Sequence, residues 1–383
     1  MPPATLDNDV HLTDRSRGTP LRYMPQLDGL RALAVLAVCF EHWEIAQRRF
    51  FRWIEWGHLG VWLFFVLSGF LITDILLKGK RPIEADQQSI WESAKTFYIR
   101  RFLRILPIYY LTLFVTAFFI HDVRRLFVWH VTYTTDFWTA LHPGDYPYGI
   151  HFWTLAIEEQ FYLAWPWIIL LTPRRWLIKV TLASLALGVS YRALFQAGAL
   201  GHSSIAALGL PILGNIDKFA FGALLAVLTQ MPDRNHAKRL GRWCLWIGFP
   251  AVLAMEALYA RNPYSRAAAM FSSAVAGLFF TGVIAGAAQG FRGPVGAILQ
   301  SRPLVYPGKI SYGLYLFHPF VPLLFVATHL AVPGSVWARF VLYAIVTVLV
   351  ASASWYLLEG PLNSLKRFFP YLSRAPVRPA ALG

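Results

Sequence analysis

Charged residues are scarce in this chain, at 14% of 383 residues against about 25% in an ordinary soluble domain. Cysteine is nearly absent as well: Cys39 and Cys244 are the two in the sequence, which excludes a disulfide framework, and they show no metal-binding spacing. No zinc-finger spacing or RNP-like aromatic motif accompanies the formal net charge of +15, so neither nucleic acid nor a metal is expected as a partner. The chain has instead a series of apolar runs of about 20 residues, the length that a helix needs to cross a bilayer.

These runs predict an all-α integral membrane protein with about ten transmembrane helices, because a helix satisfies its own backbone in lipid. The predicted spans are 28–47, 59–77, 101–121, 152–172, 176–195, 209–230, 243–260, 267–288, 309–330 and 336–358. Segment 122–151 contains Arg, Asp, His and Pro residues, which favours an interfacial loop on the outer side over an eleventh span.

Basic residues predict the orientation of these helices. With the N-terminus in the cytoplasm, cytoplasmic segments hold most of the 35 Lys and Arg residues, as the positive-inside rule requires. Ten spans then return the C-terminus to the cytoplasm. We therefore expect a cytoplasmic tail at 1–26, a membrane domain at 27–360 with a periplasmic or interfacial loop at 122–151, and a cytoplasmic tail at 361–383. Basic residues between apolar runs also suit contact with anionic membrane lipid.

Two of the predicted spans contain positive side chains, which are costly in a bilayer and therefore suggest function. Arg31 and His42 in the first span are eleven residues apart, so they share a helix face and lie about 16 Å apart along its axis. Arg101 and Arg104 in the third span also point one way, and their guanidinium groups suit phosphates. Arginines that snorkel to the cytoplasmic surface and a histidine at the outer rim would give the same pattern without forming a site.

Two adjacent carboxylates, Glu158 and Glu159, lie near the start of the fourth span, on the side predicted for His42. A histidine and a glutamate at one depth are the parts of a general base and of the residue that orients it. Alternatively, one of the carboxylates faces the lipid headgroups.

Four further residues are weaker candidates for acceptor binding or for lining the site: Ser68, Asp217, Tyr312 and His318. A structural explanation is open for most of them. Ser68 and the glycine after it could serve close helix packing. Asp217 could lie at the surface, and His318 precedes a proline that frees a backbone carbonyl.

Six segments of the chain, in this order, resemble the acyltransferase-3 family of membrane acyltransferases and cover nearly its full length. They are residues 27–32 with His42, 64–72, 100–107, 153–162, 310–318 and 358–361. The family's Arg-x10-His motif maps onto Arg31 and His42, and its Arg-x-x-Arg motif maps onto Arg101 and Arg104. The first acidic residue of its Trp-Ser/Thr-Leu-x-x-Glu stretch maps onto Glu158. The Arg-Asp pair that opens the family's sixth span is replaced here by Asn215-Ile216-Asp217.

The resemblance implies O-acylation of a sugar-containing acceptor, such as an envelope polysaccharide or a glycolipid, in the bacterial cytoplasmic (inner) membrane. It implies acetyl-CoA as the donor substrate, with no permanently bound cofactor. We expect the donor phosphates near Arg31, Arg101 and Arg104 and the pantetheine arm directed toward His42, which Glu158 would orient. Since no soluble domain follows the last span, direct transfer by the membrane domain is expected.

Several alternatives stay open at this level. His42 could act as a general base or as a nucleophile that forms an acyl-histidine. A transporter or flippase of a lipid-linked sugar would also need buried charges, although the sequence contains no inverted repeat. A structural or sensor protein is a third alternative, but it would leave the buried charges without a purpose. The acceptor, the acyl chain length and the oligomeric state are not predicted.

Overall fold

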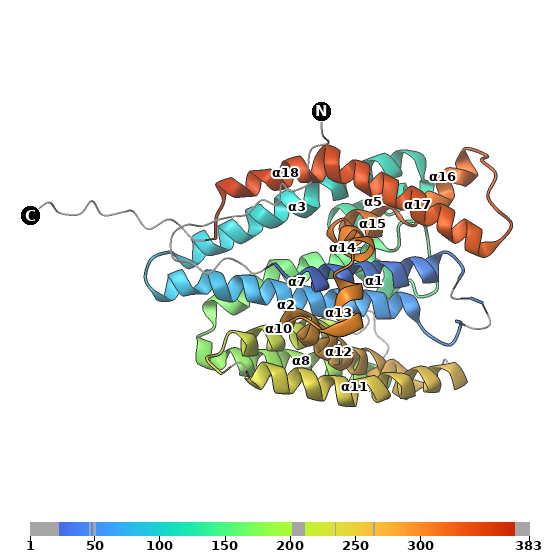
Figure 1. The fold of residues 1–383 in the computed structure, drawn as a ribbon. Coiled ribbons are helices and arrows are strands. Elements are labelled where there is room, and N and C mark those ends of the chain that lie inside the picture. The colour runs from blue at the N-terminus through green and yellow to red at the C-terminus, as the bar shows by residue number, and fades with distance from the viewer. Residues whose placement is uncertain are drawn as a thin grey trace, which may run out of the picture.

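The computed structural model describes residues 23–45, 47–48, 51–200, 211–233, 235–262 and 265–371, and every regular element within these ranges is a helix. The elements are α1 (Pro25–His42), α2 (Trp56–Glu84), α3 (Ile90–Phe119), α4 (His121–Arg125), α5 (Phe127–Val131), α6 (Thr135–Leu141), α7 (Phe152–Leu171), α8 (Arg174–Gln196), α10 (Ile216–Thr229), α11 (Asn235–Arg261), α12 (Arg266–Gln289), α13 (Gly293–Leu299), α14 (Arg302–Lys309), α15 (Ser311–Phe317), α16 (Phe320–Ala327), α17 (Val336–Ser354), η1 (Trp355–Glu359), α18 (Gly360–Ser364) and η2 (Leu365–Phe368). Figure 1 shows the long helices running roughly parallel to one another, and the predicted all-α class is confirmed. Most of both predicted tails, and residues 209–210 of the sixth predicted span, lie outside the described residues.

Seven helices in the described part of the chain are long and apolar enough to cross a membrane. They are Trp56–Glu84, Ile90–Phe119, Arg174–Gln196, Pro211–Thr229, Asn235–Arg261, Arg266–Gln289 and Val336–Phe368. The first and fourth predicted spans are also helices, α1 and α7, but polar side chains lower their apolar character. These include Asp28, Arg31 and Glu41 in α1, and Glu158 and Glu159 in α7.

The ninth predicted span, 309–330, is not one continuous helix. The chain forms α15 up to Phe317, turns at His318 and Pro319, and continues as α16 from Phe320. Proline has no backbone N–H to donate, and its ring clashes with the carbonyl one turn earlier. The interruption places His318 at a break between two short helices rather than in the middle of a span.

Segment 122–151 contains three short helices, α4, α5 and α6, of five, five and seven residues. None approaches the roughly 20 residues that a span requires. The segment folds against α7, where the side-chain amide of Gln160 donates to both carboxylate oxygens of Asp136 at 3.0 Å. Burial raises the pKa of Asp136 to about 6, against the effect of the Gln160 hydrogen bond.

Helix α2 lies at the centre of the bundle and packs against α1, α7, α10 and α12. Glycines allow α2 and α10 to approach each other closely. A Cβ atom on Gly69 would overlap the carbonyl oxygen of Phe219, and one on Gly222 would overlap that of Val66. The backbones of α2 and α10 therefore touch, which confirms close helix packing at Gly69. Ser68, one residue earlier, faces α7 instead.

The end of α7 is also fixed against α2. Lys80 is buried, and its ammonium group donates to the carbonyl oxygens of Ile169, Leu170 and Thr172 at 2.9, 2.8 and 2.5 Å. The last carbonyls of a helix have no partner within it and carry partial negative charge, so a lysine there satisfies and stabilises them. This contact holds the helix that carries Glu158 in register with α2.

Candidate active site

A small cavity of about 80 Å³, here called the arginine cavity, is lined by residues of α1, α2, α3, α7 and α15. It brings together six residues that the sequence had singled out: Arg31, Ser68, Arg101, Arg104, Glu158 and Tyr312. Much of the remaining wall is aromatic or aliphatic. The shared helix face predicted for Arg101 and Arg104 is confirmed, since both line this one space.

The guanidinium groups of the arginine cavity are poorly compensated by the protein. Arg101 and Arg104 have no hydrogen-bond or ion-pair partner among the described residues. The guanidinium carbon of Arg101 lies over the Tyr162 ring, 5.0 Å from its centre. Arg31 is partly compensated, because its Nη1 lies 3.3 Å from Oδ1 of Asp28. Three guanidinium groups against the single carboxylate of Glu158 on the cavity wall suit an anion with several oxygens, such as a phosphate.

Glu158 is held by residues of its own and the neighbouring helix. The Ser68 hydroxyl donates to Oε1 of Glu158 at 2.8 Å, and the Ser68 oxygen lies 3.0 Å from the hydroxyl of Tyr162. This chain of three polar groups links α2 to α7 at the cavity wall. Tyr162 was not singled out from the sequence, although its position one helical turn after Glu158 could have indicated it.

A larger cavity of about 440 Å³, here called the histidine cavity, adjoins the first and contains His42. Val61, Thr154 and Tyr315 line both cavities, so the two spaces meet at this neck. The Thr154 and Tyr315 hydroxyl groups are 2.6 Å apart there. Arg31 and His42 therefore lie in successive compartments, about 16 Å apart along α1.

The hydrogen bonds of the His42 ring determine which of its nitrogens is free. Nδ1 of His318 lies 2.6 Å from the carbonyl oxygen of Tyr315. A carbonyl can accept but not donate, so this nitrogen carries the proton. In neutral His318, Nε2 then accepts, and it lies 2.7 Å from Nδ1 of His42. His42 therefore donates through Nδ1 and keeps the lone pair on Nε2.

Neutral His318 is the form that its surroundings favour. Its side chain is buried, and it has no carboxylate partner among the described residues, so a charged ring would be an uncompensated cation. The two rings are stacked with an interplanar angle of 6°. The indole N–H of Trp43 donates to the carbonyl oxygen of His318 at 3.1 Å, which holds the chain at the break after α15.

The predicted pairing of His42 with Glu158 is not a direct contact in the structure. No hydrogen bond joins them among the described residues: Glu158 lines the arginine cavity and is bound to Ser68, while His42 lines the histidine cavity and is bound to His318 behind it. The topology places His42 and Glu158 at a similar depth in the membrane only to within about one helical turn, or about 5 Å. A hydrogen bond requires their polar atoms to be about 3 Å apart. His318, placed by the helix break at Pro319, occupies the position that the sequence had given to Glu158.

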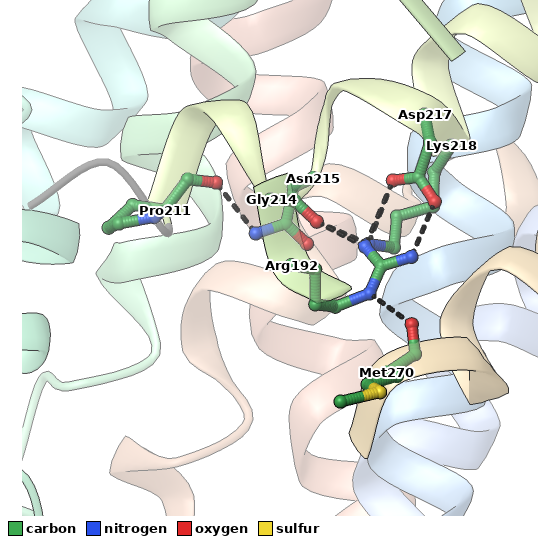
Figure 2. Close-up of polar contacts among 7 residues, drawn as sticks. All are labelled: Arg192, Pro211, Gly214, Asn215, Asp217, Lys218 and Met270. Atoms are coloured by element: carbon green, nitrogen blue, oxygen red, sulfur yellow. Dashed lines mark hydrogen bonds and ion pairs between the residues drawn. The ribbon is translucent and has the colours of Figure 1, made fainter. Parts of the chain in front are cut away.

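Two further predicted site residues, Glu159 and Asp217, line neither of these cavities. Asp217 is not at the surface either; it is fully buried in a charged cluster that Figure 2 shows. Nη2 of Arg192 lies 2.9 Å from Oδ2 of Asp217, and the Lys218 ammonium lies 3.2 Å from Oδ1. We call Arg192, Asp217 and Lys218 the closed cluster.

The closed cluster also satisfies its donors with backbone carbonyls. Arg192 donates to the carbonyl oxygens of Gly214 at 2.5 Å and Met270 at 2.8 Å, and Lys218 donates to that of Gly214 at 3.0 Å. It thereby joins α8, the start of α10 and α12. Arg192 was missed in the sequence, although an arginine near the end of an otherwise apolar helix was the available signal.

Several residues of the histidine cavity were also missed. They include Glu41, Glu55, His58 and His151. Glu55 and His58 are three residues apart at the start of α2, and their side chains approach to 3.5 Å. Burial acts to raise the pKa of the Glu55 carboxyl, but hydrogen bonds from His58 and Tyr259 and the charge of His58 outweigh it and leave that pKa lowered. No three or more His, Cys, Asp or Glu side chains in the described ranges are arranged to hold a metal ion.

The fold and site define a helical membrane protein with two adjoining cavities, each lined by charged as well as apolar side chains. The model of the acyltransferase-3 family, described as an acyltransferase domain, matches residues 24–358. The chain therefore belongs to this family.

Curated relatives agree with the family assignment. The chain is 29% identical to YrhL of Bacillus subtilis over 90% of its length, and 28% identical over 89% to the peptidoglycan O-acetyltransferase OatA of Listeria monocytogenes. It is 26% identical over 89% to the O-acetyltransferase OatA of Staphylococcus aureus. These matches cover 55%, 56% and 57% of the relatives, so the chain spans about half their length. No solved structure matches it.

Proposed function

We propose that this chain transfers an acetyl group from cytoplasmic acetyl-CoA to a hydroxyl group of a carbohydrate-containing acceptor of the cell envelope. The observation that carries the proposal is the pair of adjoining cavities, one lined by arginines and the other containing His42, which meet at a neck. The names of the relatives from Listeria and Staphylococcus specify O-acetyl transfer, and the first specifies peptidoglycan. Peptidoglycan is therefore one member of the acceptor class.

The arginine cavity would bind the donor through its phosphates. Arg101 and Arg104 offer guanidinium groups that form no ion pair with the described residues, and Arg31 adds a third. The extended pantetheine arm is of the same order of length as the roughly 16 Å from Arg31 to His42 along α1. It would pass between Val61, Thr154 and Tyr315 and bring the thioester to His42.

His42 would act through Nε2, the nitrogen left free by His318. Nε2 removes the proton of the acceptor hydroxyl while the hydroxyl oxygen bonds to the thioester carbonyl carbon. The bond from this carbon to sulfur then breaks, and the imidazolium returns its proton to the departing sulfur. The products are an acetyl ester and free coenzyme A. In the alternative order, Nε2 itself attacks the thioester and the acceptor hydroxyl removes the acetyl group from an acyl-histidine.

The proposal includes a topology of ten spans in the bacterial inner membrane, with both termini in the cytoplasm. The short or interrupted segments α1, α7 and α15–α16 would complete the seven long apolar helices. Reporter fusions should place residues 79–95 and 231–242 inside and 122–151 outside. An outside position for 231–242 would refute this topology.

Purified protein in lipid nanodiscs tests the function with acetyl-CoA labelled on the acetyl group. Peptidoglycan fragments should become labelled while free coenzyme A accumulates in equal amount. Label that stays on the protein after denaturation, and is lost in His42→Ala, would identify the acyl-histidine route. A transporter of a lipid-linked sugar would consume no acetyl-CoA, and that outcome would overturn the proposal.

A further inference from the structure

The histidine cavity has a size and a lining that suit one or two sugar rings. Its volume of about 440 Å³ lies within the range of about 300–1,000 Å³ that small-molecule sites occupy. The lining includes the polar side chains of Glu41, Glu55, His58 and Tyr259, and the Trp153 side chain supplies an aromatic wall. An acyl chain would leave these polar groups without partners, whereas sugar hydroxyl groups would satisfy them.

Glu41 stands out among these residues because it immediately precedes His42. Its Oε2 is buried and has no hydrogen-bond partner in the described ranges. The backbone N–H groups of Trp56 and Gly57 approach this carboxyl group, but Oε2 itself has no donor among the described residues, and an ionised carboxylate can only accept hydrogen bonds. Glu55, with its lowered pKa, is a second acceptor in the same space, and His58 fixes it at 3.5 Å.

Positive charge in the lining of this cavity comes from Arg52 and, when its ring is protonated, from His58. Arg52 is exposed, and its guanidinium carbon lies over the Trp53 ring at 4.5 Å from the ring centre. His42 and His151 bring no formal charge in the neutral form. Arg52 and a protonated His58 at most balance the carboxylates of Glu41 and Glu55, so the cavity has no surplus positive charge to bind a negatively charged ligand group.

We propose that the histidine cavity is the acceptor subsite and that it takes an uncharged sugar residue, whose hydroxyl groups donate to Glu41 and Glu55. This inference rests on the proposed function, in which His42 receives the proton of an acceptor hydroxyl. It adds a specificity rule: the ring that reaches His42 carries no carboxylate, phosphate or sulfate, so uronic acids and phosphorylated sugars are excluded from the subsite. Glu41 and Glu55 are the residues that make this distinction.

Isothermal titration of the full chain in nanodiscs tests the subsite without requiring turnover. The probes are an uncharged tetramer of N-acetylglucosamine and an anionic tetramer of galacturonic acid. The uncharged tetramer should bind at least about 10-fold more tightly, since a like-charge contact costs on the order of one hydrogen bond to a charged group. Glu41→Gln with Glu55→Gln should weaken its binding by about 10-fold to 100-fold and reduce the preference for it.

The matched control is Glu44→Gln, because Glu44 is exposed and pairs with Arg339 outside the cavity; this variant should bind both probes as the original chain does. Acetyl-CoA titrations with every variant verify that the protein is folded. Failure of the original chain to bind the uncharged tetramer, tighter binding of the anionic tetramer, or an unchanged preference in the double Gln variant would each overturn the subsite. Since no outcome depends on acetyl transfer, failure of the proposed function would be seen separately, as absent acetyl-CoA consumption.

Discussion

Two groups of charged side chains lie inside the helical body, and they differ in how the protein compensates them. In the closed cluster, Arg192 is bound by Asp217 and by two carbonyl oxygens, and the cluster lines neither described cavity. In the arginine cavity, Arg101 and Arg104 have no anionic partner among the described residues and face an open space. A charge inside a membrane protein suggests function by default, but compensation decides what kind of role it has.

A compensated cluster stabilises the fold, because its charges hold helices together and most of its donors are bound by the protein. An uncompensated cluster beside a cavity instead presents charge to whatever enters. The same distinction separates His318, whose ring nitrogens are both engaged, from His42, which keeps Nε2 free toward a cavity. The substitutions below should affect stability in the first group and ligand binding or turnover in the second.

The largest effect is expected from Arg192→Ala, which leaves a buried aspartate without its principal partner. Breaking a buried ion pair by removing one member costs about 3–5 kcal/mol, so the melting temperature and the yield of folded protein should fall strongly. Arg174→Ala is the control, since Arg174 pairs with Glu84 at the surface and such pairs contribute about 0–1 kcal/mol. Equal losses in both variants would mean that the closed cluster is not a stabilising device.

His42→Ala should have the opposite profile. Turnover should fall by about 10²–10⁴-fold, the usual contribution of a general base, while the melting temperature and the affinity for acetyl-CoA stay close to the original values. His236→Ala provides a control, because His236 is exposed and lies beside Asp233. Normal turnover by His42→Ala would refute its catalytic role, and loss of donor binding would make it a binding residue.

Arg101→Ala and Arg104→Ala should each weaken acetyl-CoA binding by about 10-fold to 100-fold, the value of one hydrogen bond between charged groups. Lys at either position should restore binding only in part, because an ammonium group lacks the planar fork. Arg100→Ala is a stringent control from the same helix, since Arg100 donates to the carbonyl oxygens of Lys366 and Phe369. Donor binding that is insensitive to both cavity arginines would assign them to membrane topology alone.

The sequence predicted the features of this site that depend on residue spacing within a single helix. The spacing of Arg31 and His42 and that of Arg101 and Arg104 are properties of single helices, so helix geometry alone placed each pair on one face. The apolar runs likewise predicted the long helices. Helices α1 and α7 have a weak membrane signal because they carry Asp28, Arg31, Glu158 and other polar site residues.

What the sequence missed depends on contacts between helices far apart in the chain. His318 lies 276 residues after His42, and it reaches the ring because Pro319 ends α15 at that point. Arg192 reaches Asp217 from α8, a neighbouring helix. The residue directly before Asp217 in the sequence is Ile216, which is not basic. Periodicity fixes which face of a helix a side chain occupies, but not which neighbour that face will meet.

A smaller effect on turnover than at His42, and the one that most directly tests the difference between the two histidines, is expected at His318. If its Nε2 orients His42, His318→Ala should lower turnover by about 10-fold to 100-fold, a cost like that of losing the partner that orients a metal-bound histidine. A glutamine at this position can present its side-chain oxygen where Nε2 lies and accept from Nδ1 of His42. His318→Gln should therefore recover much of the loss, and the ascending limb of the pH profile of kcat should shift in His318→Ala but return toward its original position in His318→Gln. Equal loss in both variants with an unshifted profile would mean that His318 serves only to pack the break between α15 and α16.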